Sequence, residues 1–418
     1  MAATLQTGTK VNYLEGIRGI AAFMVLGHHF MLAFYPGAYD NNPARFHTKT
    51  LEHWYYASPL NVLTNGNFCV TIFFVLSGYV LSKRYWQQKD ISIVSSAAKR
   101  RFPRLFIPVA FTLILSYILL NLSLYKHKEA AVISHSDWWL GALWPMDPSF
   151  GTLMQYMFKD VMFLGSADYD TSMWTMKLEL FGSFIVFGLL MFTHLTNRKG
   201  VYFIFLGSIF VLLALNGQAF YYIGFVFGMM LNDVEALVQK RKDTNANYVL
   251  VPALIIAGFF LGSYPSLNFA HYGFWEFIYK WSFGQKMIDS FAYVLFHTAG
   301  AMMLVTAVVI SPGLQKLFST KIFRFLGLIS FSFYLLHPLV IGAFSCPMML
   351  KLVPGMGYNK AGLLVLFLTA GITVLISWLM AITVDRFSID FSKKYLGNAS
   401  DRKKPLPLKK KKEKVAAS

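Results

Sequence analysis

The chain has 418 residues, of which 56% are hydrophobic and only 14% are charged, and its formal net charge is +18. Soluble domains carry about 25% charged residues, so this composition excludes an ordinary soluble protein and predicts a polytopic membrane protein. We expect the positive charge to reflect membrane topology and contact with lipid headgroups. The sequence contains no zinc-finger or RNA-binding pattern, so nucleic acid is not an expected partner.

Ten apolar segments predict an all-α fold, a polytopic bundle of about ten transmembrane helices with both termini in the cytoplasm. The predicted spans are residues 16–35, 67–83, 105–124, 173–194, 201–216, 218–231, 249–263, 291–310, 322–344 and 361–384. Residues 201–231 are interrupted at 216–218 and are expected to form either two short spans or one broken helix. The loop after the second span is basic and the loop after the third is acidic, as alternation under the positive-inside rule requires.

Three regions follow from this pattern. Residues 1–12 are predicted to be cytoplasmic, and they lack the apolar core of a secretory signal peptide, so the first span is expected to be an uncleaved anchor. Residues 13–390 form the predicted membrane domain. Residues 391–418 are rich in lysine and lack a core pattern, so we expect a disordered cytoplasmic tail. We expect the protein in the plasma membrane or an endomembrane; nothing in the sequence indicates its oligomeric state.

The first span, YLEGIRGIAAFMVLGHHF at 13–30, contains Glu15, Arg18, His28 and His29. Eleven residues separate Arg18 from His29, which is about three helical turns, so both share one stripe and lie about 16 Å apart along the axis. Ionisable groups within a membrane normally face the protein interior or a wet cavity, which makes them functional candidates. The alternative is that Glu15 and Arg18 lie at the headgroup level and His29 is a hydrogen-bonded core histidine.

Polar residues also mark the next two spans. Ser77, in FFVLSGYVLS at 73–82, is followed by Gly78 and is expected to permit close helix packing. Arg101 and Arg104 flank Pro103 in KRRFPRLFIP at 99–108. This basic run either sets topology at the inner membrane boundary or forms a clamp for phosphates, because guanidinium groups match phosphate oxygens.

Two later spans carry further candidates. Glu179, in MWTMKLELFGSF at 173–184, needs a partner inside a membrane and is either half of a structural pair with an arginine or a functional carboxylate. In ISFSFYLLHPLVI at 329–341, Ser330, Tyr334 and His337 share one helical stripe, and Pro338 follows immediately. A hydrogen-bonded core histidine is the alternative interpretation of His337.

Taken in order, these segments resemble the integral-membrane acyltransferases of the type-three class. The resemblance covers residues 13–390. It rests on EGIR at 15–18 with His29 eleven residues after the arginine, on FFVLSGY, on RRFPRLFIP, on Trp174 five residues before Glu179, and on YLLHPLV. Two departures are present: Glu15 stands where aspartate is commoner, and WTMKLELFGS stands where WSLxxExxFY is usual.

The resemblance implies transfer of an acyl group, most often acetyl, from cytoplasmic acyl-CoA to a hydroxyl of a glycan, a lipid or a small molecule, without a metal. His29 would be the general base, matched to this task because imidazole titrates near neutral pH, and Glu15 or Glu179 would orient it. Arg18, Arg101 and Arg104 would hold the coenzyme phosphates and polarise the carbonyl. The residues expected to contact substrate are Ser77, Trp174, Tyr334 and His337.

A second class of protein also fits ionisable residues inside a membrane, namely a proton-coupled small-molecule transporter or a flippase without covalent chemistry. Broken spans suit alternating access. Two features favour the enzyme over the carrier. The two halves of the sequence show no corresponding interrupted spans, and basic residues cluster where a phosphate-rich ligand would dock from the inner side.

Overall fold

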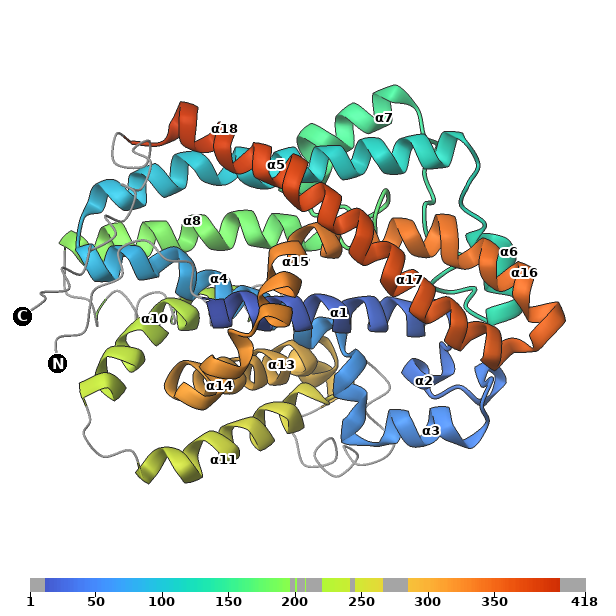
Figure 1. The fold of residues 1–418 in the computed structure, drawn as a ribbon, viewed down its shortest axis with the longest axis horizontal. Coiled ribbons are helices and arrows are strands. Elements are labelled where there is room, and N and C mark those ends of the chain that lie inside the picture. The colour runs from blue at the N-terminus through green and yellow to red at the C-terminus, as the bar shows by residue number, and fades with distance from the viewer. Residues whose placement is uncertain are drawn as a thin grey trace, which may run out of the picture.

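A computed structural model describes residues 12–195, 220–240, 245–265 and 285–398, together with Gly200 and Gly207. Within these residues the regular secondary structure is entirely helical (Figure 1). The long helices are α1 (Asn12–Phe34), α4 (Gly66–Gln88), α5 (Ile91–Asn121), α8 (Trp174–Leu195), α10 (Phe220–Lys240), α11 (Asn245–Gly262), α13 (Gln285–Ile310), α15 (Lys321–Val340) and α17 (Tyr358–Met380). The shorter elements are α2 (Gly37–Asp40), η1 (Pro43–Arg45), α3 (Thr50–Ala57), η2 (Pro59–Thr64), α6 (His127–Ser134), α7 (Phe150–Gln155), η3 (Tyr156–Leu164), α14 (Pro312–Phe318), η7 (Ile341–Ser345), α16 (Cys346–Met356), η8 (Ala381–Asp385) and α18 (Arg386–Leu396).

Eight of the described helical stretches are long and apolar enough to cross a membrane. They coincide with eight of the predicted spans, and the predicted span 249–263 coincides with the shorter apolar helix Tyr248–Gly262. The predicted span 201–216 and the interruption at 216–218 lie outside the described residues. The prediction of an all-helical membrane bundle is therefore confirmed.

Helix α17 shows how the bundle is suited to lipid. Its large apolar side chains Leu363, Phe367 and Leu375 are 58%, 68% and 56% exposed. Its buried stripe contains small polar residues, including Thr369 and Thr373. This arrangement reverses the amphipathic pattern of soluble helices, because lipid accepts apolar side chains whereas polar hydroxyls need partners inside the protein.

Glycines bring two pairs of helices to backbone contact. In the first pair, a Cβ atom at Gly327 of α15 would overlap the carbonyl oxygen of Glu15 in α1, and one at Gly19 of α1 would overlap the backbone around Gly327. In the second pair, Gly78 of α4 lies against the carbonyl group of Phe225 in α10. The close approach predicted at Gly78 is therefore confirmed, and it follows from the absence of a side chain.

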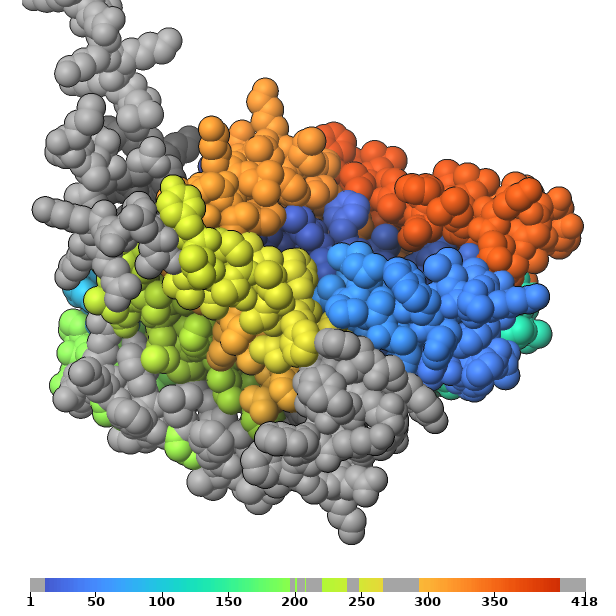
Figure 2. All heavy atoms as spheres, turned by 90° about the horizontal axis from the view of Figure 1, so that it is seen from below, coloured from blue at the N-terminus to red at the C-terminus, as the bar shows by residue number. Residues whose placement is uncertain are grey.

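Residues 125–172 form a segment that we call the cap, and it covers the end of the bundle where α2, α3, α6 and α16 gather (Figure 1). Within the cap, Trp144 stacks on Tyr125 with 4.1 Å between ring centroids and donates a hydrogen bond of 3.0 Å to the Tyr169 carbonyl. Ser136 donates to the carbonyl of Leu32 at 2.7 Å, which ties the cap to α1. Figure 2 views the molecule from the side of α3 and α11, where the dark blue α1 lies recessed between its neighbours.

The opposite end is closed by α18, which continues from α17 through the π-helical turn η8. Helix α18 ends at Leu396, so ordered structure continues past residue 390, where the sequence predicted a disordered tail to begin. Asn398 then donates hydrogen bonds to the Ser92 carbonyl and the Ser96 hydroxyl at the start of α5. The basic stretch from 399 to 418 lies outside the described residues.

Candidate active site

Seven of the predicted site residues line one cavity of about 530 Å³ between α1, α4, α5, α8, α15 and the α17–α18 stretch. We call it the larger cavity. Those seven residues are Glu15, Arg18, Ser77, Arg101, Arg104, Glu179 and Tyr334. A volume of this size is typical of ligand pockets. The sequence motifs of five separate helices, α1, α4, α5, α8 and α15, therefore converge on one chamber.

A smaller cavity of about 180 Å³ contains His29 and Trp174. Its other lining residues are mostly aromatic or polar: His28, Tyr39, Asn67 and Tyr293, with Val25 and Gly66. Val70 and Tyr334 line both cavities, so these two side chains form the partition between the chambers. The base predicted from the sequence thus lies on one side of a thin wall, and the cationic cluster lies on the other.

Two of the three predicted phosphate-binding arginines already have carboxylate partners. Arg101 forms a salt bridge with Glu179 and donates from Nε to the Ser183 hydroxyl at 2.7 Å. Ser77 donates to Glu179 at 2.6 Å, so Glu179 has the structural arginine pair that the sequence left open as an alternative. Nη1 of Arg18 lies 3.4 Å from Oε1 of Glu15, which is one helical turn earlier in α1.

Arg104 differs from the other two arginines. It is exposed at the cavity mouth, and no ion pair among the described residues involves it. A guanidinium group without a counter-charge at the entrance of a cavity is available to an anionic ligand.

His29 is paired with another imidazole. Its Nδ1 lies 2.6 Å from Nε2 of His337, and Nδ1 of His337 lies 3.1 Å from the Phe333 carbonyl oxygen. A carbonyl oxygen can only accept, so Nδ1 of a neutral His337 carries the proton and its Nε2 accepts from Nδ1–H of His29. The remaining nitrogen of His29, Nε2, is then the basic one.

This pairing corrects two expectations. The hydrogen-bond partner of His29 is His337, where a carboxylate of Glu15 or Glu179 was expected. Glu15 lies fourteen residues before His29, about 21 Å along the helix, and Glu179 is occupied by Arg101 and Ser77. His337 was expected to contact substrate, but it is fully buried and lines neither cavity.

Trp139 of the cap was not among the predicted site residues. Its ring stacks on His29 with 5.3 Å between centroids and an interplanar angle of 25°. Residues 125–172 contain three tryptophans, but the sequence alone could not show which of their rings reaches the histidine. The cap therefore covers the outer face of the imidazole pair.

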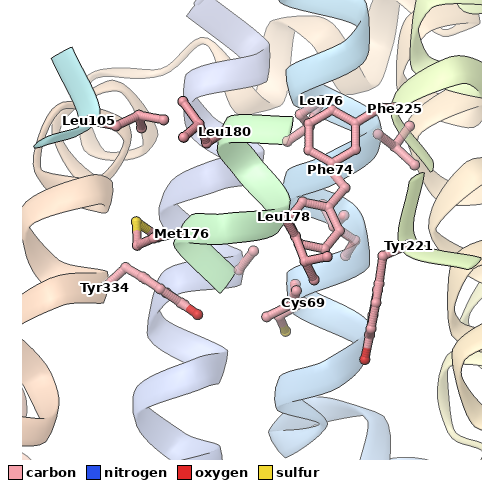
Figure 3. Close-up of a cluster of buried hydrophobic side chains, with 14 of the residues drawn as sticks. Cys69, Phe74, Leu76, Leu105, Met176, Leu178, Leu180, Tyr221, Phe225 and Tyr334 are labelled. Carbon is pink, nitrogen blue, oxygen red and sulfur yellow. The ribbon is translucent and has the colours of Figure 1, made fainter. Parts of the chain in front are cut away.

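Tyr334 is held in place by the loop before α8. Its hydroxyl donates to the Ser172 carbonyl at 3.1 Å and lies 3.0 Å from the Thr175 hydroxyl. Asp170 accepts hydrogen bonds from the backbone N–H and hydroxyl of Ser172, both at 2.7 Å. Burial raises the pKa of Asp170 to about 7, and the bonds from Ser172 only partly oppose this shift. Figure 3 shows Tyr334 extending from α15 into the apolar cluster that contains Cys69 and Met176.

The fold and the two cavities define a multi-pass membrane protein whose buried imidazole pair adjoins a cationic chamber. The family model described as an acyltransferase domain matches residues 11–382, and the chain belongs to this family. It is similar to the O-acetyltransferase PaAT-1 of Phomopsis amygdali, with 24% identity over 443 aligned positions that cover 94% of this chain and 83% of the relative. No solved structure matches the chain.

Family membership confirms the resemblance noted from the sequence motifs. It also decides between the enzyme and the transporter in favour of the enzyme. The protein is a membrane acyltransferase.

Proposed function

We propose that this acyltransferase moves an acyl group, acetyl in the first instance, from acyl-CoA in the larger cavity to an acceptor hydroxyl in the smaller cavity. The observation that carries this proposal is the shared wall of Val70 and Tyr334. It places the cationic residues and His29 in adjoining chambers, so a donor and an acceptor can meet at the partition. His29 acts as the general base.

The donor assignment follows from charge. The larger cavity is lined by five basic and four acidic side chains, and Arg104 is not neutralised by a carboxylate among the described residues. Coenzyme A is polyanionic, and guanidinium groups bind phosphate oxygens in a charge-assisted manner. The basic loops that the positive-inside rule assigns to the cytoplasm lie at this end of α4 and α5, where acyl-CoA would enter.

The acceptor assignment follows from the chemistry of the smaller cavity. Asn67, Tyr39 and Tyr293 give this cavity polar side chains, and Trp174 gives it an aromatic face. Such a lining suits a hydroxyl-bearing glycan, lipid or small molecule. The name of the similar O-acetyltransferase supports an oxygen acceptor and an acetyl donor.

The proposed reaction proceeds by direct attack. Nε2 of His29 removes the hydroxyl proton while the acceptor oxygen forms a bond to the thioester carbonyl carbon. The carbon–sulfur bond then breaks, and the coenzyme thiolate leaves and takes up the proton. His337 accepts a hydrogen bond from Nδ1–H of His29 and so stabilises the imidazolium that forms between these steps.

Membranes that contain the full chain and radiolabelled acetyl-CoA test the base assignment. We expect His29→Ala to reduce acetyl incorporation by about 10²- to 10⁴-fold, the range for loss of a general base. The matched control is His53→Ala, because His53 is exposed and its Nδ1 is hydrogen-bonded to Oδ1 of Asn41. Full incorporation by a correctly inserted His29→Ala protein would contradict the proposal.

A further inference from the structure

Helix α18 forms one wall of the larger cavity, although the sequence motifs end before it. Ile382, Asp385, Arg386, Ile389, Asp390 and Lys393 from η8 and α18 line that cavity. These positions form two neighbouring rows with a spacing of four residues, so they occupy one continuous face. From Ile382 to Lys393 this face is about 16 Å long.

The other face of α18 is apolar and exposed. Phe387 and Tyr395 are 59% and 57% exposed, and the ring of Phe391 lies between them, tilted, with centroid separations of 5.9 and 4.9 Å. A helix with an aromatic face and a charged face is typical of the membrane interface. Asn398 fastens its end to α5. The charged face is thereby fixed toward the cavity.

Of the two α18 cations that line the cavity, Arg386 and Lys393, Lys393 is the one that remains available to a ligand. Arg386 pairs with Asp390 at 2.9 Å. In the part of the chain that the structure describes, no ion pair involves Lys393. Lys393 lies in the last turn of α18, about 10 Å further along the helix than Arg386. It therefore occupies the end of this wall that is farthest from His29.

The larger cavity thus holds two cations without counter-charges among the described residues, Arg104 on α5 and Lys393 on α18. Acyl-CoA carries two separate groups of phosphates. Its diphosphate follows the pantetheine arm, and its ribose 3′-phosphate lies beyond the diphosphate, farther from the thioester. A lysine ammonium is a compact point charge that suits a phosphate monoester.

We propose that Lys393 binds the 3′-phosphate of the donor coenzyme at the outer end of the larger cavity, while Arg104 binds the diphosphate. This assignment rests on the proposed use of acyl-CoA. It makes α18 part of the donor site and gives the enzyme a way to distinguish coenzyme A from its 3′-dephospho form.

The test compares acetyl-CoA with 3′-dephospho-acetyl-CoA as donors for the full-length protein in nanodiscs. We expect Lys393→Ala to raise KM for acetyl-CoA about tenfold and to leave KM for the dephospho donor unchanged, because that donor lacks the group Lys393 contacts. Arg104→Ala should raise KM for both donors. Lys394→Ala is the matched control, since Lys394 lies over the Tyr395 ring and does not line the cavity.

Direct binding of coenzyme A and 3′-dephospho-coenzyme A, followed by calorimetry, gives a readout that does not depend on turnover. An equal effect of Lys393→Ala on both ligands, or no effect on either, would overturn the assignment. An effect seen only in nanodiscs with anionic lipid would also overturn it and would identify a lipid headgroup as the partner. If the wild-type protein transfers no acyl group from either donor, the proposed function itself fails.

Discussion

The two cavities differ in the charge of the side chains that line them. The larger cavity is lined by nine ionisable acidic or basic side chains and opens beside exposed residues such as Arg104 and Lys393. The smaller cavity contains histidines and neutral side chains only, and Trp139 covers its key imidazole. Charge is thus kept where water can reach it, because an unpaired ion in a dry interior is costly. In the proposed mechanism, His29 lies in the uncharged cavity, where a neutral imidazole can accept a proton.

Replacement of His337 tests the neutral side of this comparison and has the largest expected effect. We expect His337→Ala to lower kcat about 10- to 100-fold with little change in donor KM, since a hydrogen bond to a charged group is worth about 1.5–3 kcal/mol. His337→Gln should recover much of this loss, because its amide oxygen can accept from Nδ1–H of His29. Steady-state kinetics in nanodiscs with labelled acetyl-CoA measure both variants.

The glutamine variant separates positioning from packing. If His337 only fills space, the two variants should differ in melting temperature and not in kcat. Equal kcat values for His337→Ala and His337→Gln would show that the hydrogen bond between His337 and His29 does not assist the base.

Replacement of Val70 tests the wall between the chambers and has a smaller expected effect. Val70→Ala should raise the ratio of kcat/KM for propionyl-CoA to that for acetyl-CoA about tenfold, because one methylene group in a fitted pocket is worth about a factor of ten. Val226→Ala is the control, because Val226 is also buried but lines neither cavity. A ratio that changes no more than in the control would show that the partition does not limit acyl size.

Replacement of Asp170 tests the support of Tyr334 and has the smallest expected effect on catalysis. Its pKa is raised by burial from an ordinary 3.8 to about 7, so between these values the unfolded chain ionises first and stability falls as pH rises. Near pH 6 the equilibrium constant for folding should fall almost tenfold for each pH unit. Asp170→Asn removes the dependence.

Melting temperatures from pH 5 to pH 8 provide the measurement for Asp170. The wild type should lose stability up to about pH 7 relative to Asp170→Asn and then run parallel to it. Asp147→Asn, which changes an exposed carboxylate of the same cap, should follow the wild type. Parallel curves for all three proteins would contradict the buried, protonated state of Asp170.

Local patterns predicted much of this arrangement. Arg18 and His29 share a helix stripe, and in the structure they line two adjoining cavities. Apolar runs of sufficient length gave the spans, because lipid imposes helices on them. The cavity lined by Arg101 and Glu179 could be expected from buried charges that need partners.

Long-range pairing was not predictable in the same way. His29 and His337 are 308 positions apart. Neither sequence motif predicts the hydrogen bond between the two imidazoles. The contact between Trp139 and His29 depends on how the cap folds over α1, and sequence composition does not predict that fold. Helix α18 was missed because the lysines of the following segment obscured the aromatic spacing of Phe387, Phe391 and Tyr395.

The glycine contact between α1 and α15 limits where insertions and deletions can be tolerated. His29 is ten residues beyond Gly19, and His337 is ten residues beyond Gly327. The two helices are thus parallel and in register, because their glycines meet at one level and their histidines meet ten residues further on. A single inserted residue in either interval would turn its histidine by about 100°. Deletions and insertions can accumulate in the cap or the loops, but these two intervals must keep equal length for the imidazoles to meet.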